Sequence, residues 1–131
     1  MWAVGLVGSG LICEGLKLYF RVPRPMVHTF YAFGSGRRAG YSFPSGHTMA
    51  VTVMLGMLVL LAWRGATRGR RRAMVAGAAG MSVVVGFGLM YIGVHALSEV
   101  LAGQAAAVAW LGVLRMLMPG DANVEDCAPA A

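Results

Sequence analysis

The chain has 131 residues, of which 58% are hydrophobic and only 12% are charged, and its mean hydropathy is +0.68. This composition lies well outside that of soluble globular proteins and predicts one integral membrane domain. The net charge is +6, but the basic residues cluster between apolar runs and do not line one amphipathic face. The clustering argues against nucleic acid as a partner and favours membrane phosphates or phosphate-bearing ligands.

Four apolar segments follow one another along the chain, each near the ~20 residues that a helix needs to cross a bilayer. They cover residues 2–20, 44–63, 73–92 and 95–118. We therefore predict an all-α, polytopic transmembrane helical bundle of about four spans, with a membrane-embedded domain over residues 1–118 and a short polar tail over residues 119–131. Because no charged region precedes the first run, we expect it to be a retained span and not a signal peptide.

The connections between these segments differ in character. Residues 21–43 form a long loop rich in Pro, Gly and Arg, residues 64–72 form a short loop with five arginines, and Gly93-Val94 is barely a turn. An even number of spans places the first and third connections on the same side. If the basic residues of the first loop bind a ligand, the positive-inside rule places residues 64–72 in the cytoplasm. We therefore expect a multi-pass cell-membrane protein whose 21–43 loop faces the extracytoplasmic side.

Small residues recur four positions apart inside the apolar segments. Such pairs let membrane helices approach closely, and we expect them to serve packing. The pairs are Gly5 with Ser9, Ala76 with Gly80, and Gly103 with Ala107.

The segment Pro44-Ser45-Gly46-His47 opens the second apolar run. Proline suits the first turn of a helix, so the backbone N–H groups of Ser45 and Gly46 would be free at the positive end of the helix dipole. A glycine at this point lets a phosphate oxygen approach the backbone, and His47 adds a proton donor. A plain helix cap beside an interfacial histidine explains the same residues.

His95 and Glu99 open the fourth apolar run and lie four residues apart. On a helix they share one face, so the carboxylate can accept a proton from one ring nitrogen and leave the other as a nucleophile or base. Ionisable groups in membrane segments usually have a function, although a purely structural hydrogen bond is the alternative. A metal site with His28, His47, His95 and Glu99 is disfavoured, because no typical metal-ligand spacing is present.

Lys17 and Arg24 form a third basic element, at the end of the first apolar run and in the loop that follows. The planar guanidinium can hold two phosphate oxygens while the ammonium adds a point charge. Contact of both side chains with lipid headgroups is the alternative. Glu14 lies three residues before Lys17 and is expected to pair with it.

Taken together, these segments resemble the type 2 phosphatidic acid phosphatase (PAP2) superfamily, which also includes vanadium haloperoxidases. The resemblance lies in Lys17-x6-Arg24-Pro25, then Pro44-Ser45-Gly46-His47, then His95-x3-Glu99, and covers roughly residues 17–103. Three blocks in this order, each at the end of a predicted span, make the resemblance specific, and the predicted spans suggest the membrane lipid phosphatases of that superfamily.

The resemblance implies a metal-independent phosphatase that needs no cofactor. Its substrate would be a lipid phosphomonoester or diphosphate, such as phosphatidate, phosphatidylglycerophosphate or an isoprenyl diphosphate. His95 would attack phosphorus to form a phosphohistidine, Glu99 would orient it, and His47 would protonate the leaving oxygen. Substrate phosphate would be held by Lys17, Arg24 and the backbone N–H groups of Ser45 and Gly46.

The chain departs from the family pattern in three respects. The family has Ser-Arg where this chain has Gly88-Leu89, which removes a phosphate-binding arginine, and Glu99 stands where Asp is usual. Lipid phosphatases of the family usually have six spans, so two would be missing before residue 1. A truncated product, or a small protein completed by a neighbouring subunit in a homo-oligomer, would account for this.

These departures leave two other functions open. The first is a catalytically weak or inactive relative that binds anionic lipid or phosphate, for which Leu89 is the main support. The second is a small helical transporter or assembly subunit, which would leave the three blocks as coincidence.

Overall fold

The computed structural model describes residues 2–23 and 40–118 of the chain. Four α-helices follow in order: α1 (Trp2–Phe20), α2 (Gly46–Leu61), α3 (Arg68–Tyr91) and α4 (Leu97–Leu117). Each falls on one of the four predicted apolar segments, so the prediction of an all-α bundle is confirmed. The largest difference in bounds is at α3, which begins five residues before its predicted start because the arginines of the 64–72 loop already form its first turn.

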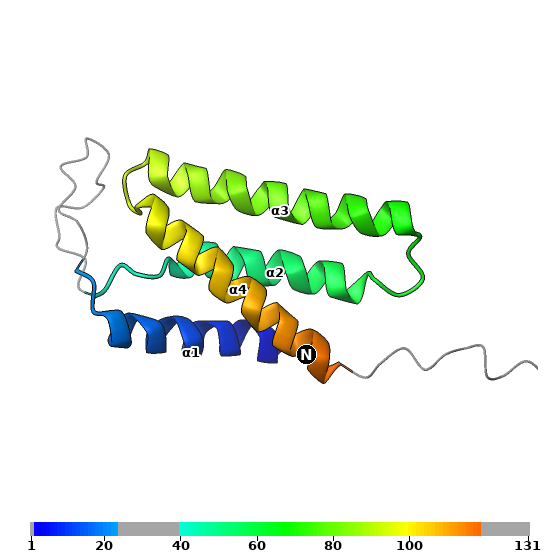
Figure 1. Cartoon of the computed structure of the whole chain (residues 1–131), viewed down its shortest axis with the longest axis horizontal. Coiled ribbons are helices and arrows are strands. Elements are labelled where there is room, and N and C mark those ends of the chain that lie inside the picture. Colours follow the sequence, from blue (N-terminus) through cyan, green and yellow to red (C-terminus); the bar gives the residue numbers. More distant parts are fainter. Residues whose placement is uncertain (1, 24–39, 119–131) are drawn as a thin grey trace, which may run out of the picture.

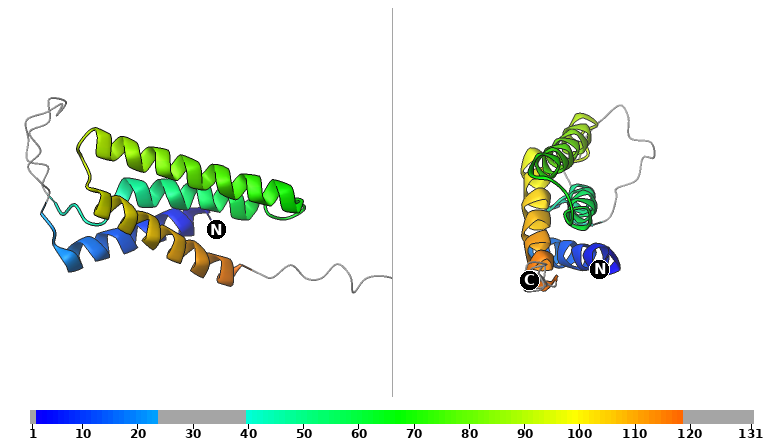
Figure 2. Two further views of the ribbon diagram at one scale, coloured as in Figure 1. Left: turned by 45° about the horizontal axis from the view of Figure 1, so that its top comes forward. Right: turned by 90° about the vertical axis from the view of Figure 1, so that its right-hand side faces the viewer.

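Helix α2 is the centre of the bundle and contacts each of the other three helices. It lies between α1 and α3, and α4 crosses it obliquely (Figures 1 and 2). The end of α1, the start of α2, the end of α3 and the start of α4 all lie at one end of the molecule (Figure 1). The 62–67 connection lies at the opposite end, together with the start of α1 and the end of α4.

Local interactions fix where the helices begin and end at the first of these two ends. Ser45 caps α2, because its hydroxyl oxygen accepts from the Thr48 N–H at 3.4 Å and from the Thr48 hydroxyl at 2.9 Å. The Ser42 N–H donates to the Val22 carbonyl at 2.9 Å, which holds the approach to α2 against the residues that follow α1. Gly93 stops α3 with a φ of 74°, a left-handed conformation that glycine adopts without steric cost.

The core is a narrow column between α1, α2 and α4. Its buried side chains are Cys13, Met49, Val53, Met57, Ala107 and Leu114. The small residues predicted to serve packing divide into two groups. Gly5, Ser9, Gly103 and Ala107 are buried at contacts between helices, whereas Ala76 and Gly80 on α3 are exposed. Four of the six small residues therefore provide close helix packing.

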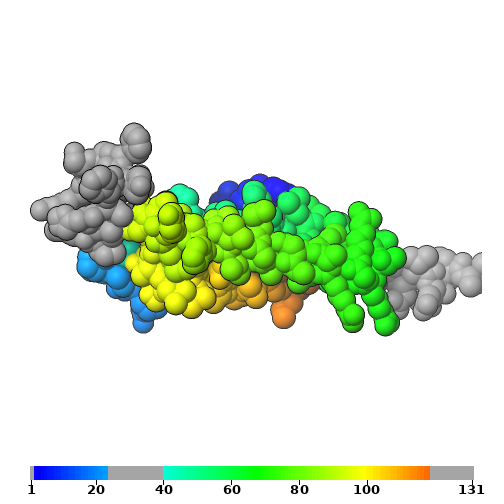
Figure 3. Space-filling model, turned by 90° about the horizontal axis from the view of Figure 1, so that it is seen from above, coloured from blue at the N-terminus to red at the C-terminus, as the bar shows by residue number. Residues whose placement is uncertain are grey.

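The outer surface of the bundle is apolar. Among the described residues, α1, α3 and α4 are long and apolar enough to cross a membrane, while α2 is apolar but has only 16 residues. Three of the four expected spans are therefore long enough to cross a membrane, and the central helix α2 is shorter than expected. Only 11% of the apolar window of α3 is buried, and this helix runs uncovered along the face seen in Figure 3. Such a surface suits contact with lipid chains.

Aromatic side chains mark the end of the bundle where α1 finishes and α2 begins. Tyr19 packs edge-on against Phe20, and Phe20 packs in the same way against Phe43, with ring centroids 5.1 and 5.0 Å apart. Tyr19 and Tyr91 are more than 80% exposed. Because aromatic rings gather at the membrane–water boundary, they indicate that this end of the bundle lies at the level of the lipid headgroups.

Candidate active site

The predicted catalytic pair lies in direct contact at the start of α4. His95 Nδ1 lies 2.7 Å from Glu99 Oε2, and the two side chains are only 6% and 5% exposed. The same carboxylate oxygen accepts from the Ala96 N–H at 3.3 Å. A carboxylate at Nδ1 favours the tautomer with its proton on that nitrogen, which leaves the lone pair on Nε2 for chemistry. The predicted contact is therefore present, but His95 precedes the N-cap Ala96 and does not share a helix face with Glu99.

His47 lies across from His95, in the first turn of α2. The centroids of the two imidazole rings are 6.4 Å apart and their planes are inclined by 56°. His47 is exposed, whereas His95 is nearly covered. A ligand bound between the two rings would therefore contact one buried histidine and one histidine that is exposed to water.

The start of α2 differs in one respect from the sequence prediction. Its first helical residue is Gly46, so Pro44 precedes the cap and does not stand in the first turn. The Ser45 N–H donates to the Glu99 backbone carbonyl at 3.0 Å. The prediction of a free amide at Ser45 is therefore wrong, because α4 lies close enough for its Glu99 carbonyl to accept a hydrogen bond from this N–H. Within the described residues, the N–H groups of Gly46 and His47 have no such partner.

The closeness of α2 and α4 depends on Gly103. A Cβ on Gly103 would lie 2.6 Å from the Ser45 carbonyl oxygen, a separation that real side chains do not show. Gly103 thus lets the backbone of α4 reach the cap of α2 and brings Glu99 to Ser45. The sequence marks Gly103 as a packing residue, but only the structure connects it to the site.

Ser42 is a second residue whose position links it to the site. It is 1% exposed and lies beside the Glu99 carboxylate. Its hydroxyl also lies 3.3 to 3.4 Å from the carbonyls of Val22 and Pro23. A buried serine beside a carboxylate helps to fix that carboxylate in one position. No pattern in the sequence connects Ser42 with Glu99, because 57 residues separate them.

Lys17 reaches the start of α2 from the last turn of α1. Its ammonium nitrogen lies 3.7 Å from the position that a Cβ on Gly46 would occupy. The same nitrogen donates to Glu14 Oε1 at 2.6 Å, so the predicted pair is confirmed. The Lys17 side chain is 18% exposed and that of Glu14 is 67% exposed. Lys17 therefore points its charge at the backbone of Gly46, while Glu14 lies towards solvent.

Other predicted residues fall elsewhere. Arg24 and His28 lie outside the described residues, so their places relative to the site stay predictions. Leu89, which stands where the family has an arginine, is half-buried near the end of α3, and its carbonyl accepts from the Val94 N–H at 3.1 Å. It therefore lies beside the short turn that leads to His95.

The described residues also bear on the metal alternative. Between residues 2–23 and 40–118, no three His, Cys, Asp or Glu side chains gather as metal ligands would. The donors at the site are two imidazoles and one carboxylate that is already hydrogen bonded to His95 and Ala96. Metal independence stays a prediction, for which a chelator provides the direct test.

Comparison with known proteins bears on the family and the fold. The sequence pattern of the PAP2 superfamily matches residues 2–121. The fold is similar to that of the first transmembrane PAP2-type phosphatidylglycerolphosphate phosphatase from Bacillus subtilis, with a TM-score of 0.74 and 19% identity. That similarity covers 89% of this chain and 59% of the other, so this chain spans somewhat more than half of that protein. No curated protein gave a match.

A match over nearly the whole chain decides the family. The chain belongs to the PAP2 superfamily and has the fold of its transmembrane phosphatases.

Proposed function

We propose that the chain is a membrane lipid phosphatase that hydrolyses a lipid phosphomonoester or diphosphate through a phosphohistidine. The observation that carries the proposal is the His95–Glu99 pair at 2.7 Å, with the His47 ring 6.4 Å from the His95 ring. One imidazole is set up as a nucleophile, and the other is placed to serve as an acid. The family and the similar phosphatase structure support the same class of reaction.

In the first step, the lone pair on His95 Nε2 attacks phosphorus and the bond from phosphorus to the leaving oxygen breaks. His47, in its protonated form, donates a proton to that oxygen, and the lipid alcohol or lipid monophosphate departs. Glu99 stabilises the positive charge that develops on His95. The step needs an unprotonated Nε2 on His95 and a proton on His47 that can be donated.

In the second step, water attacks the phosphohistidine and the P–N bond breaks. His47, now neutral, accepts a proton from the water, so inorganic phosphate is released and both side chains return to their starting forms. Negative charge on the phosphoryl oxygens would be met by Lys17 and by the N–H groups of Gly46 and His47. Phosphoryl transfer depends chiefly on such positioning and charge stabilisation.

Arg24 belongs to the proposal through the family pattern alone, as a further ligand of the substrate phosphate. The Ser45 N–H does not bind the substrate phosphate in this proposal, because it already donates a hydrogen bond to the Glu99 backbone carbonyl. The backbone N–H of His47 binds the phosphate in place of the Ser45 N–H.

A lipid fits this site better than a soluble phosphate ester does. The site opens at an end of the bundle with exposed aromatic rings and an apolar outer surface, so the scissile phosphate would lie at headgroup depth. We propose that this end faces the extracytoplasmic side of the cell membrane and that membrane lipids surround the rest of the bundle. Assembly with a second copy is compatible with the large exposed face of α3.

A second function rests on Leu89. A PAP2 protein without the arginine at this position would bind anionic lipid or phosphate and turn it over slowly or not at all. Loss of one charge-assisted hydrogen bond costs about 1.5–3 kcal/mol, which is roughly ten- to a hundred-fold in rate if it acts in the transition state.

Phosphate release separates these functions. The purified chain in detergent, with a chelator present, is offered phosphatidate, phosphatidylglycerophosphate and an isoprenyl diphosphate, and wild type is compared with His95→Ala. Release by wild type that disappears in the variant supports the phosphatase, and the substrate ranking follows from the same data. Equal release from both folded proteins would sink the proposal, and lipid binding without release would favour the non-catalytic function.

A further inference from the structure

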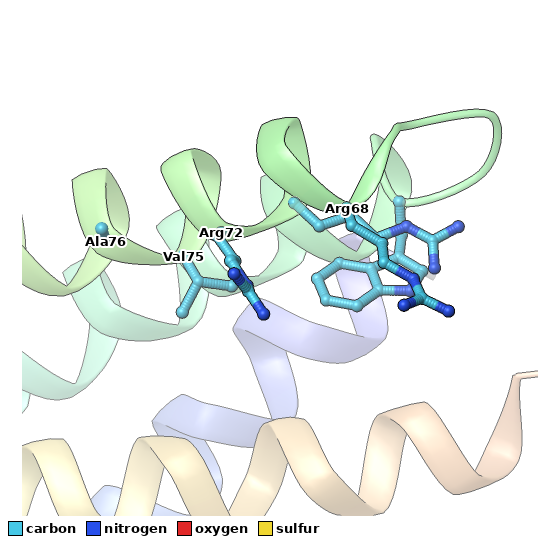
Figure 4. Close-up of a pocket in the computed structure, with 6 residues that line it drawn as sticks. Arg68, Arg72, Val75 and Ala76 are labelled. Atoms are coloured by element: carbon cyan, nitrogen blue, oxygen red, sulfur yellow. The ribbon is translucent and has the colours of Figure 1, made fainter.

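A second basic surface lies at the other end of the bundle, around the 62–67 connection and the first turns of α3. A shallow, open pocket of about 610 Å³ lies there. It is lined by Trp63, Arg68, Arg71, Arg72, Val75 and Ala76 (Figure 4). Helix α2, with 16 residues at about 1.5 Å each, separates this pocket from His47 by about 24 Å. The pocket is therefore distinct from the candidate active site.

The polar part of the pocket is positively charged and incompletely paired. Arg71 Nε is buried and makes no hydrogen bond to the described residues. The guanidinium carbon of Arg71 lies 5.0 Å from the centroid of the Trp63 ring, which holds this side chain by a cation–π contact. The carboxylates of the described residues are Glu14 and Glu99, and neither lines the pocket. Three guanidiniums close in sequence repel one another unless an anion lies between them.

The lining changes from charged to apolar along α3. Arg68, Arg72 and Ala76 succeed one another four residues apart, as do Arg71 and Val75, so these five residues share one face of the helix. Figure 4 shows Arg68 and Arg72 followed along the helix by Val75 and Ala76. The same face continues on a helix whose apolar window is only 11% buried. A ligand of matching shape has an anionic head and an apolar chain.

The position of Trp63 indicates that a ligand of this pocket would lie at the membrane boundary. The Trp63 backbone is fixed in a turn, because its N–H donates to the Leu60 carbonyl at 3.4 Å and its carbonyl accepts from Ala66 at 3.3 Å. Tryptophan rings gather at headgroup depth, and basic pockets beside membrane helices bind anionic headgroups. We propose that Trp63, Arg68, Arg71 and Arg72 bind the phosphate of an anionic phospholipid whose acyl chains lie along α3 beyond Val75.

The test compares two triple variants that remove the same charge from the same end of the full-length chain. One is Arg68→Gln/Arg71→Gln/Arg72→Gln, in the pocket. The other is Arg64→Gln/Arg70→Gln/Arg115→Gln, outside it. Binding of phosphatidylglycerol is measured by native mass spectrometry in micelles that also contain phosphatidylcholine. Any phosphatidylglycerol bound at the active site contributes equally to all three proteins.

The pocket variant is expected to lower phosphatidylglycerol affinity about tenfold or more, since it removes several charge-assisted contacts. The outside variant is expected to lower it less than about threefold, the size of screened, non-specific attraction. Equal losses in the two variants would overturn the proposal, because loop charge alone would then explain binding. Circular dichroism checks folding, and Arg71→Gln alone replaces the triple variant if that variant does not fold.

Two further measurements distinguish a lipid from a soluble anion. Val75→Ser is expected to weaken phosphatidylglycerol binding, and inorganic phosphate at matched ionic strength is not expected to displace the lipid. If millimolar phosphate displaces the lipid and Val75→Ser has no effect, the pocket is a site for soluble anions and the proposed lipid is wrong.

Discussion

Ser45 and Glu99 are joined by a backbone hydrogen bond of 3.0 Å, from the N–H of the α2 cap to a carbonyl in the first turn of α4. Glu99 thus contributes twice, since its carboxylate also contacts His95 at 2.7 Å. The bond connects the segment that carries His47 with the segment that carries His95. The relative position of the two histidines therefore depends on the contact between α2 and α4, and not on the loops alone.

Glu99→Gln separates these two contributions. The backbone bond to Ser45 stays, but the amide can donate to His95 Nδ1 and so place the ring proton on Nε2, where it blocks attack. We expect phosphate release to fall by about 10²- to 10⁴-fold while the melting temperature changes little. Glu99→Asp keeps the charge and should retain much more activity. Near wild-type rates for Glu99→Gln, measured on the same lipid, would show that the carboxylate does not orient His95.

Gly103→Ala tests whether the close approach of α2 and α4 positions the site. The new methyl group would meet the Ser45 carbonyl oxygen at 2.6 Å, so the two helices must move apart. Overpacking of this kind costs about 1–3 kcal/mol of stability, and we expect activity to fall with it. Gly112→Ala on the same helix is the matched control, because a Cβ there meets nothing within 4 Å. Thermal unfolding and phosphate release should both distinguish the two alanines, and equal behaviour would contradict the account.

Lys17→Gln tests the proposed phosphate contact from α1. The substitution removes the ammonium group beside Gly46, and we expect kcat/KM to fall roughly ten- to a hundred-fold. Glu14→Gln removes the other half of the ion pair, which is largely exposed. Exposed pairs contribute about 0–1 kcal/mol to stability, so this control should leave both stability and kcat/KM close to wild type. A Lys17→Gln protein with unchanged kcat/KM would place Lys17 outside the site.

Leu89→Arg restores the guanidinium that the family pattern has at this position. Because Leu89 lies half-buried beside the turn before His95, we expect phosphate release to rise by roughly ten- to a hundred-fold. Leu89→Gln is the control for polarity without charge. If neither substitution changes the rate, the absent arginine does not limit activity.

Much of the fold could be predicted from the sequence, because a bilayer permits few structures for an apolar chain of this length. Hydropathy predicts α1 without error in its bounds, and it places both ends of α2 and the end of α3 within two residues. The pattern overestimates α2, because Pro44 and Trp63 belong to its flanks. The central position of α2 results from tertiary packing, and the hydropathy of single segments cannot predict how helices pack.

The site could be predicted in part. The spacing of His95 and Glu99 predicts their contact, although His95 precedes the N-cap of α4 and the Glu99 side chain reaches back to it from the first turn. The bond from Ser45 to Glu99 and the contact of Ser42 with Glu99 do not follow from local spacing, because they join residues more than fifty positions apart. The position of Lys17 near Gly46 likewise depends on how α1 packs against α2. Arg24 remains a prediction from the family pattern.

The central claim is that His95 becomes covalently phosphorylated, and trapping that intermediate tests it most directly. A lipid substrate with a radiolabelled terminal phosphate is mixed with wild type, His95→Gln and His47→Gln, and each reaction is quenched at alkaline pH, where phosphohistidine survives. We predict label on wild type and no label on His95→Gln. On His47→Gln we predict label that forms more slowly and is lost more slowly, because this variant lacks the acid of the first step and the base of the second. Label on His95→Gln, or turnover by wild type with no labelled protein at any time, would contradict the account.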